Sequence, residues 1–180
     1  MLVSADRSML LVVDVQAKLV PVIAEAQPLV AGIVWLMRAA QRIGVPVAAI
    51  EQNPKGLGAL VPQVRELLPE AAIASKMHFS AVAAACLARL PGADRSQVVV
   101  AGIEAHVCLM QTALDLLEEG REVFVVADCV GSRRPQDRDT ALTRMRDEGV
   151  RALTREMVVF EWLGRAGTAL FRDVNREFLR

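Results

Sequence analysis

The sequence predicts an α/β fold, a three-layer α/β/α sandwich around a mostly parallel sheet of about six strands. Short, continuous apolar runs recur along the chain, as expected of strands that are buried on both faces of a parallel sheet. Helical patterns alternate with these runs, and Gly44, Gly120 and Gly149 each follow a helical pattern and precede a strand, as helix-ending glycines do. Together these observations indicate an open, Rossmann-like sheet covered by helices.

Each element follows from a local pattern. Four strong apolar runs predict strands at Met9–Val13, Val45–Ile50, Gln97–Ile103 and Glu122–Ala127. Two weaker strand candidates are Ile73–Ser75 and Val150–Leu153. Helical periodicity covers Leu29–Ile43, Ala81–Leu90, Val107–Glu119, Gln136–Glu148 and a last stretch from about Thr168 to Leu179. Residues 53–58 form the most loop-like stretch, directly after the second strand.

The amino-acid composition limits the classes of protein to which the chain can belong. The chain has 180 residues, so we expect one domain over residues 1–180, and 53% hydrophobic residues exclude a disordered chain. Lys and Arg number 21, as do Asp and Glu, so there is no basic surplus for nucleic acid or an anionic membrane. No stretch approaches the roughly 20 apolar residues of a membrane span, and the short run Met9–Val13 does not resemble a signal peptide. We therefore expect a small molecule as the partner.

Cysteine and histidine usage argues against metal sites and disulfides. The three cysteines, Cys86, Cys108 and Cys129, are odd in number and form no CxxC motif, which suits a reducing cytoplasm. The two histidines, His78 and His106, do not have metal-ligand spacing, and no nucleotide-binding glycine motif occurs. We expect neither a metal nor a cofactor.

Three reactive groups stand at the carboxyl ends of predicted strands, where open α/β sheets bind ligands. Asp14 follows the first strand, Lys76 the third, and Cys108 opens a helix after the fourth. A helix N-terminus and a nearby lysine both favour a thiolate, and Asp14 could act as general base. Each residue also has a structural interpretation: Cys108 as a small buried hydrophobe, Asp14 as a turn cap and Lys76 as a solvated side chain. Cys86 is expected in the core, and a structural role is favoured for Cys129.

The residues around these groups resemble a known family. The motifs are LVVDVQ at 11–16, SKMHFS at 75–80, and GIEAHVC at 102–108 followed by Thr112 and Asp115. In this order they resemble the isochorismatase-like cysteine hydrolases over essentially the whole chain. Within this family, the subgroup of isochorismatase domain-containing proteins and YcaC-like hydrolases looks most similar to the chain. The stretches that carry this similarity are EQNPKGLG at 51–58, Ser132-Arg133, Asp137-Arg138, Ala141-Leu142 and Arg144-Met145-Arg146.

The resemblance implies a catalytic triad of Asp14, Lys76 and Cys108. It implies attack of the cysteine on an amide-type carbonyl, loss of the amine and hydrolysis of a thioester. It also implies a cis peptide at Ile103–Glu104, with the backbone N–H groups of Glu104 and Cys108 as an oxyanion hole. A homo-oligomer is implied as well, for which the C-terminal segment with Trp162, Leu170 and Phe171 could supply an apolar patch.

Two departures from relatives narrow the expected function. Nicotinamidases of this superfamily carry a metal site after the second strand, where this chain has Glu51-Gln52-Asn53-Pro54 without a histidine. True isochorismatases usually lack the nucleophilic cysteine that Cys108 supplies. The substrate pocket is expected to be lined by Gln16, Gln52, Asn53, Phe79 and His106, and the substrate itself is left open, with N-carbamoyl amides among the candidates.

Two rival functions follow from the same residues. A non-catalytic or redox-regulated thiol binding protein would use Cys108 without turnover, and loss of Asp14 or Lys76 would then matter little. A phosphoryl-accepting receiver domain would need an acid at the end of the third strand, where Lys76 stands instead. The sequence therefore favours a cytoplasmic Asp–Lys–Cys hydrolase that acts on a small-molecule amide.

Overall fold

A six-stranded parallel sheet forms the centre of the protein, in a computed structural model that describes residues 1–180. The strands are β1 (Ser8–Val13), β2 (Val47–Gln52), β3 (Ile73–Lys76), β4 (Gln97–Ile103), β5 (Glu122–Gly131) and β6 (Arg151–Leu153). They lie in the order β3-β2-β1-β4-β5-β6, and every neighbouring pair is parallel. The predicted fold class and the six predicted strands are confirmed.

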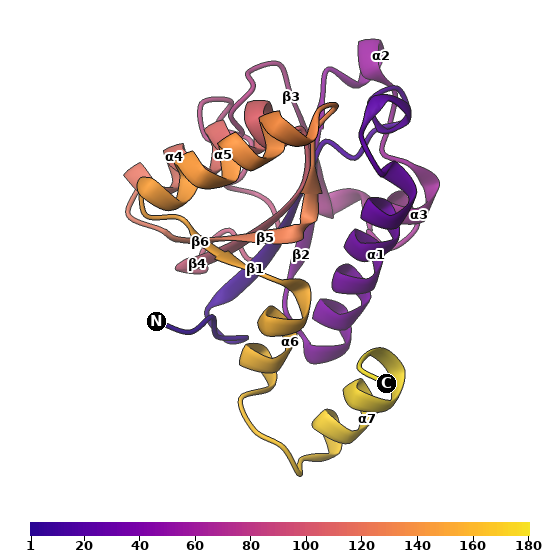
Figure 1. Ribbon diagram of the computed structural model, residues 1–180, viewed down its shortest axis with the longest axis vertical. Helices are drawn as coiled ribbons and strands as arrows, with labels where there is room; N and C mark the ends of the chain where they lie inside the picture. Colours follow the sequence, from indigo (N-terminus) through magenta and orange to yellow (C-terminus); the bar gives the residue numbers. More distant parts are fainter.

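Helices cover both faces of this sheet (Figure 1). The longer ones are α1 (Ala26–Ile43), α4 (Met110–Glu118), α5 (Pro135–Asp147), α6 (Arg155–Leu163) and α7 (Ala169–Phe178). Short turns of helix are α2 (Pro54–Leu57), α3 (Pro62–Arg65), η1 (Val20–Val22), η2 (Glu70–Ala72) and the π-helical turn η3 (Ala105–Leu109). Helices α4 and α5 lie on one face, and α1 and α6 lie on the other. None of the helices combines the length and apolar character that crossing a membrane requires.

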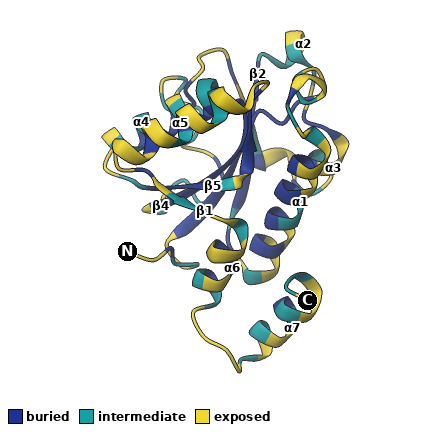
Figure 2. Cartoon of the chain, viewed as in Figure 1, coloured by how far each residue is buried: buried dark blue, intermediate teal, exposed yellow.

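The central strands are mostly apolar because both of their faces are covered. In β1, Leu10 and Val12 pack into the core on the α1 side, while Leu11 and Val13 pack into the core on the α4 side. Every residue of β1, β2 and β4 is buried, as the dark strands of Figure 2 show. Side-chain alternation therefore sends apolar groups into two cores, and the sequence shows continuous rather than alternating hydrophobicity.

The predicted helix Ala81–Leu90 is wrong. This segment forms a series of turns, so the connection from β3 to β4 contains no helix. The Ser80 hydroxyl accepts the N–H groups of Val82 and Ala83, and Ala85 takes a positive φ of 52°. Such a φ lies outside the right-handed helical region. These turns therefore interrupt the helix that the periodicity of this alanine-rich segment predicted.

Two further differences concern the second half of the chain. Strand β5 does not end at Ala127 but continues to Gly131, so Cys129 lies inside the strand. Helix α6 was not predicted, because its sequence REMVVFEWL carries apolar residues around most of its circumference and shows little periodicity.

The C-terminal segment covers the sheet and α1. Trp162 is buried, and its indole N–H donates to the Ser8 hydroxyl at 3.1 Å. Phe178 in α7 meets the ring of Trp35 edge-on, with centroids 5.8 Å apart. Leu170 and Phe171 are half-buried. The expectation that Trp162 contributes to an exposed apolar patch is therefore wrong, since its ring belongs to the core.

Gly102 brings β4 into close contact with β1 beside the residue that precedes Asp14. It has a φ of 127° and pairs in register with Val13. A Cβ atom at this position would overlap the backbone of Val13. The close approach of these strands thus requires glycine.

We expect Gly102→Ala to lower the free energy of unfolding by at least about 3 kcal/mol, because it combines an unfavourable φ with a backbone clash. Gly120→Ala is the matched control, since Gly120 also has a positive φ (82°) but open space around it, and should cost only about 1 kcal/mol. Urea denaturation measures both. Equal losses would show that the contact with Val13 contributes nothing.

Candidate active site

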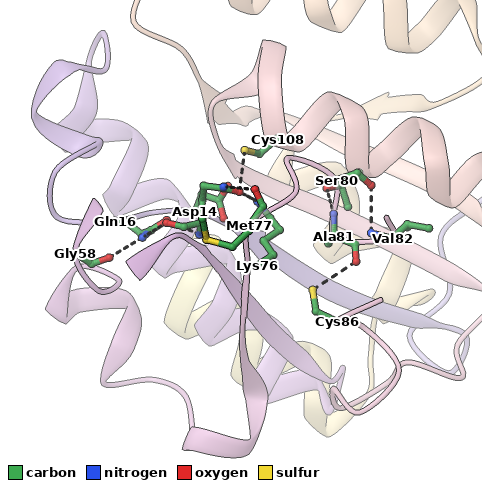
Figure 3. Close-up of polar contacts among 12 residues, drawn as sticks. Asp14, Gln16, Gly58, Lys76, Met77, Ser80, Ala81, Val82, Cys86 and Cys108 are labelled. Carbon is green, nitrogen blue, oxygen red and sulfur yellow. Dashed lines mark hydrogen bonds and ion pairs between the residues drawn. The ribbon is translucent and has the colours of Figure 1, made fainter. Parts of the chain in front are cut away.

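The carboxyl edge of the sheet brings the predicted reactive groups together (Figure 3). Asp14 directly follows β1, Lys76 is the last residue of β3, and Cys108 lies in η3, which leads from β4 into α4. Gln52, the last residue of β2, joins them because β2 lies between β1 and β3. All four residues are buried. Parallel strands therefore place the three proposed catalytic side chains at one edge, as the sequence predicted.

A buried ion pair holds this edge together. Lys76 Nζ donates to Asp14 Oδ2 at 2.9 Å, and both side chains are 0% exposed. The same ammonium donates to Gln52 Oε1 at 2.7 Å. Removing two charges from water is costly, and good geometry with additional hydrogen bonds is what offsets that cost. Lys76 is thus a paired interior cation, and the interpretation as a solvated side chain is wrong.

The second carboxylate oxygen of Asp14 is left without a partner. Oδ1 is buried and takes part in no hydrogen bond within the protein. Burial raises the pKa of the Asp14 carboxyl, while the charge of Lys76 opposes that rise. A carboxylate with one oxygen held in an ion pair and the other free has the features of a general base.

The Cys108 thiol is neutral in this arrangement. Its side chain lies in the core on the α4 side with the residue 6% exposed, and Sγ is 3.9 Å from Gln52 Oε1. Burial raises the pKa of Cys108 to about 12, the negative charge of Asp14 adds to the rise, and Lys76 opposes it. The expectation of a thiolate favoured by Lys76 and the helix N-terminus is therefore wrong for the free protein. Desolvation and Asp14 outweigh them, so attack by this sulfur requires a base.

The backbone beside Cys108 agrees with the expectation for the loop after β4. The Ile103–Glu104 peptide is cis, as predicted. The N–H of Glu104 donates no hydrogen bond within the protein. The Glu104 carboxylate is held by Arg133, whose Nε and Nη2 donate to its two oxygens at 3.0 and 2.9 Å. The unpaired backbone N–H of Glu104 therefore lies immediately before the helical turn Ala105–Leu109, which contains Cys108.

Two of the expected pocket residues are occupied by protein contacts. Gln16 is fully buried, and its Nε2 donates to the backbone oxygens of Gln52 at 3.0 Å and Gly58 at 2.6 Å. Its Oε1 accepts the backbone N–H of Gln52 at 2.8 Å. Gln16 therefore holds the end of β2 in place, and its role in lining a pocket stays a prediction. Asn53, half-buried with a φ of 40°, begins α2, and its Oδ1 accepts the N–H of Gly56.

Two further expected pocket residues, Phe79 and His106, are less buried than Asp14, Lys76 and Cys108. Phe79 is 53% exposed, and Met77, next to Lys76, is 70% exposed. His106 is half-buried, with Nδ1 2.9 Å from the Ser132 hydroxyl. Sequence reasoning missed Ser132 and Arg133 as neighbours of the site, because it ended the fifth strand four residues too early. Glu51, which belongs to the motif at 51–58, is a buried acid whose carboxylate accepts the N–H of Leu60.

The other two cysteines differ from Cys108 in position. Cys129 is fully buried within β5, where burial raises its pKa to about 12. Cys86 is half-buried rather than enclosed in the core, and its thiol donates to the Ala81 carbonyl. All three thiols are free. No group of three or more His, Cys, Asp or Glu side chains is placed to hold a metal ion.

Comparison with protein families decides where the chain belongs. The isochorismatase domain model matches residues 8–157, a range that contains all the site residues described above. The chain belongs to the isochorismatase family. Isochorismatase domain-containing protein 2 of Danio rerio is 36% identical to it, over 96% of this chain and 87% of that protein.

Solved structures of related proteins share this fold. A structure described as the MAR1 ribonuclease of Caenorhabditis elegans is 33% identical, with a TM-score of 0.88 over 100% of this chain and 93% of that one. YcaC from Pseudomonas aeruginosa, solved with hexane-2,5-diol and covalent acrylamide, is 26% identical, with a TM-score of 0.85 over 99% and 92% of the two chains. Membership in this family supports a hydrolytic function.

A neutral buried thiol should react with an alkylating agent in a strongly pH-dependent way. We expect the rate of iodoacetamide labelling at Cys108 to rise about tenfold per pH unit between about pH 7 and 10, because the thiolate fraction does so below the pKa. Peptide mapping in a Cys86→Ala background measures this rate. A rate that levels off near neutral pH would contradict the neutral thiol.

Proposed function

We propose that this protein is a cysteine hydrolase that cleaves an amide-type C–N bond of a small molecule through a thioester on Cys108. The observation that carries the proposal is the free Oδ1 of Asp14 beside a neutral thiol, with Lys76 bound to the other carboxylate oxygen. A thiol of high pKa needs a positioned base to become a nucleophile, and an unpartnered carboxylate oxygen meets that need.

The first half of the reaction forms the thioester. Asp14 Oδ1 takes the proton of the thiol as Sγ forms a bond to the substrate carbonyl carbon, and the carbonyl electron pair moves onto oxygen. The N–H groups of Glu104 and Cys108 bind that oxyanion. When the tetrahedral intermediate collapses, the C–N bond breaks, and the proton on Asp14 passes to the leaving nitrogen. The amine departs neutral and Asp14 is again a carboxylate.

The second half restores the enzyme. Asp14 takes a proton from water while the water oxygen bonds to the thioester carbon, and the same N–H groups bind the new oxyanion. The C–S bond then breaks, and the proton on Asp14 returns to sulfur as the carboxylic acid leaves. The positive charge of Lys76, paired with Asp14, limits the accumulation of negative charge on Asp14 and sulfur.

Relatives and composition support this choice of substrate. The YcaC structure contains covalent acrylamide, which is consistent with a reactive nucleophile in this fold. The ribonuclease name of another relative raises RNA as a substrate. We favour a small amide because this chain has no basic surplus, which RNA binding normally uses. Three free cysteines suit a reducing compartment, and we propose the cytoplasm as the place of action.

The triad can be tested by single and paired substitutions once an amide library has yielded a substrate, detected as an acyl adduct on Cys108 by intact mass. We expect Asp14→Asn, Lys76→Ala and Cys108→Ala each to lower kcat at least about a hundredfold, with little further loss in pairs, because residues that act as a unit are not additive.

Lys55→Ala, at an exposed lysine after β2, is the control and should keep wild-type activity. Full activity of Lys76→Ala would overturn the triad. A thiol binding protein without turnover would instead bind its ligand equally well after loss of Asp14 or Lys76.

We also expect the protein to self-associate. Large apolar side chains remain exposed, among them Val22, Met77, Phe79, Met157 and Phe160. Burying such side chains against a second copy is favourable. Light scattering at micromolar concentration should give a mass that is a multiple of 19.5 kDa; the mass of one chain would contradict this expectation.

A further inference from the structure

Gln52 is held at the site by hydrogen bonds from both its backbone and its side chain. Its backbone N–H donates to Gln16 Oε1 at 2.8 Å, and its backbone oxygen accepts from Gln16 Nε2 at 3.0 Å. Its side-chain Nε2 donates to the Met77 carbonyl at 2.8 Å. Its Oε1 accepts from Lys76 at 2.7 Å and lies 3.9 Å from the sulfur of Cys108. The backbone groups, the amide oxygen and one amide N–H of this residue are therefore each held by a neighbour.

Only one orientation of the Gln52 side-chain amide is compatible with these neighbours. A carbonyl oxygen such as that of Met77 can only accept, and an ammonium such as that of Lys76 can only donate. Rotating the amide by half a turn would place its NH₂ against the ammonium and its oxygen against a carbonyl. The amide oxygen consequently faces Lys76 and Cys108, and a hydrogen bond from the thiol can reach it.

We propose that Gln52 is a positioning residue that holds Cys108 in its neutral, protonated form until substrate binds. Two effects of one oxygen atom support this role. A hydrogen bond accepted from S–H stabilises the thiol over the thiolate. The same oxygen accepts one N–H of Lys76, which limits how strongly the ammonium, already acting on Cys108, can stabilise a negative charge on the sulfur. The inference rests on the proposed function, in which Cys108 is the nucleophile.

The role predicts opposite effects for two substitutions of similar size. Gln52→Met removes the acceptor without adding charge, so an N–H of Lys76 becomes free for the sulfur, and the thiolate is favoured. Gln52→Glu keeps the shape but places a second carboxylate next to the sulfur, so the thiolate is disfavoured. A residue with a merely structural role would change reactivity in the same direction in both variants, or in neither.

The test measures iodoacetamide labelling of Cys108 at fixed pH in a Cys86→Ala background. We expect labelling to be at least about threefold faster in Gln52→Met and about tenfold slower in Gln52→Glu, which corresponds to a rise of about one unit in the thiol pKa. Gln136→Leu, at an exposed glutamine of α5, is the matched control and should label at the wild-type rate.

Each outcome bears on the proposal. Slower labelling in both variants, or no change in either, would overturn it. If Gln52→Met does not fold, Gln52→Glu alone decides, and labelling at or above the wild-type rate would overturn the role. The assay needs no turnover, so it remains informative if the amidase proposal fails, and that failure would appear separately as activity that survives Cys108→Ala.

Discussion

The ion pair between Lys76 and Asp14 is the interaction on which the rest of this site depends. Both charges are removed from solvent, so neither residue can be replaced alone without leaving an uncompensated charge, a loss of about 3–5 kcal/mol in other proteins. The strand order explains the surroundings of the pair. Its two partners come from β1 and β3, and β2 runs between them, so the last residue of β2 must lie beside the ammonium.

The same pair determines how the thiol can react. Lys76 is hydrogen-bonded to Asp14 and Gln52, and although its charge lowers the pKa of Cys108, burial and the negative charge of Asp14 outweigh it. The arrangement therefore favours a thiol that a general base deprotonates during the reaction over a thiolate that is present beforehand. This distinction follows from geometry, since the same residue types at a solvated helix N-terminus would favour the anion.

The features that could be predicted from the sequence are those that depend on local residue patterns and on the parallel arrangement of the strands. Strands β1 and β4 were predicted almost to the residue because they are continuous apolar runs, and parallel strands necessarily bring Asp14, Lys76 and Cys108 to one edge. The turns after Ser80 could not be predicted in this way, since a side-chain hydroxyl and a positive φ override helical periodicity there. The state of the thiol and the bracing by Gln16 depend on distances between segments far apart in the chain, which periodicity does not encode.

The enclosure of Cys108 has a consequence for the lifetime of the protein. Peroxides oxidise cysteines in proportion to their thiolate character and their accessibility, and here both are low. An idle molecule therefore exposes little reactive sulfur to oxidants or to foreign electrophiles. The half-buried Cys86 is the more accessible thiol, so chemical damage during storage would accumulate away from the proposed nucleophile and leave the proposed reaction centre intact.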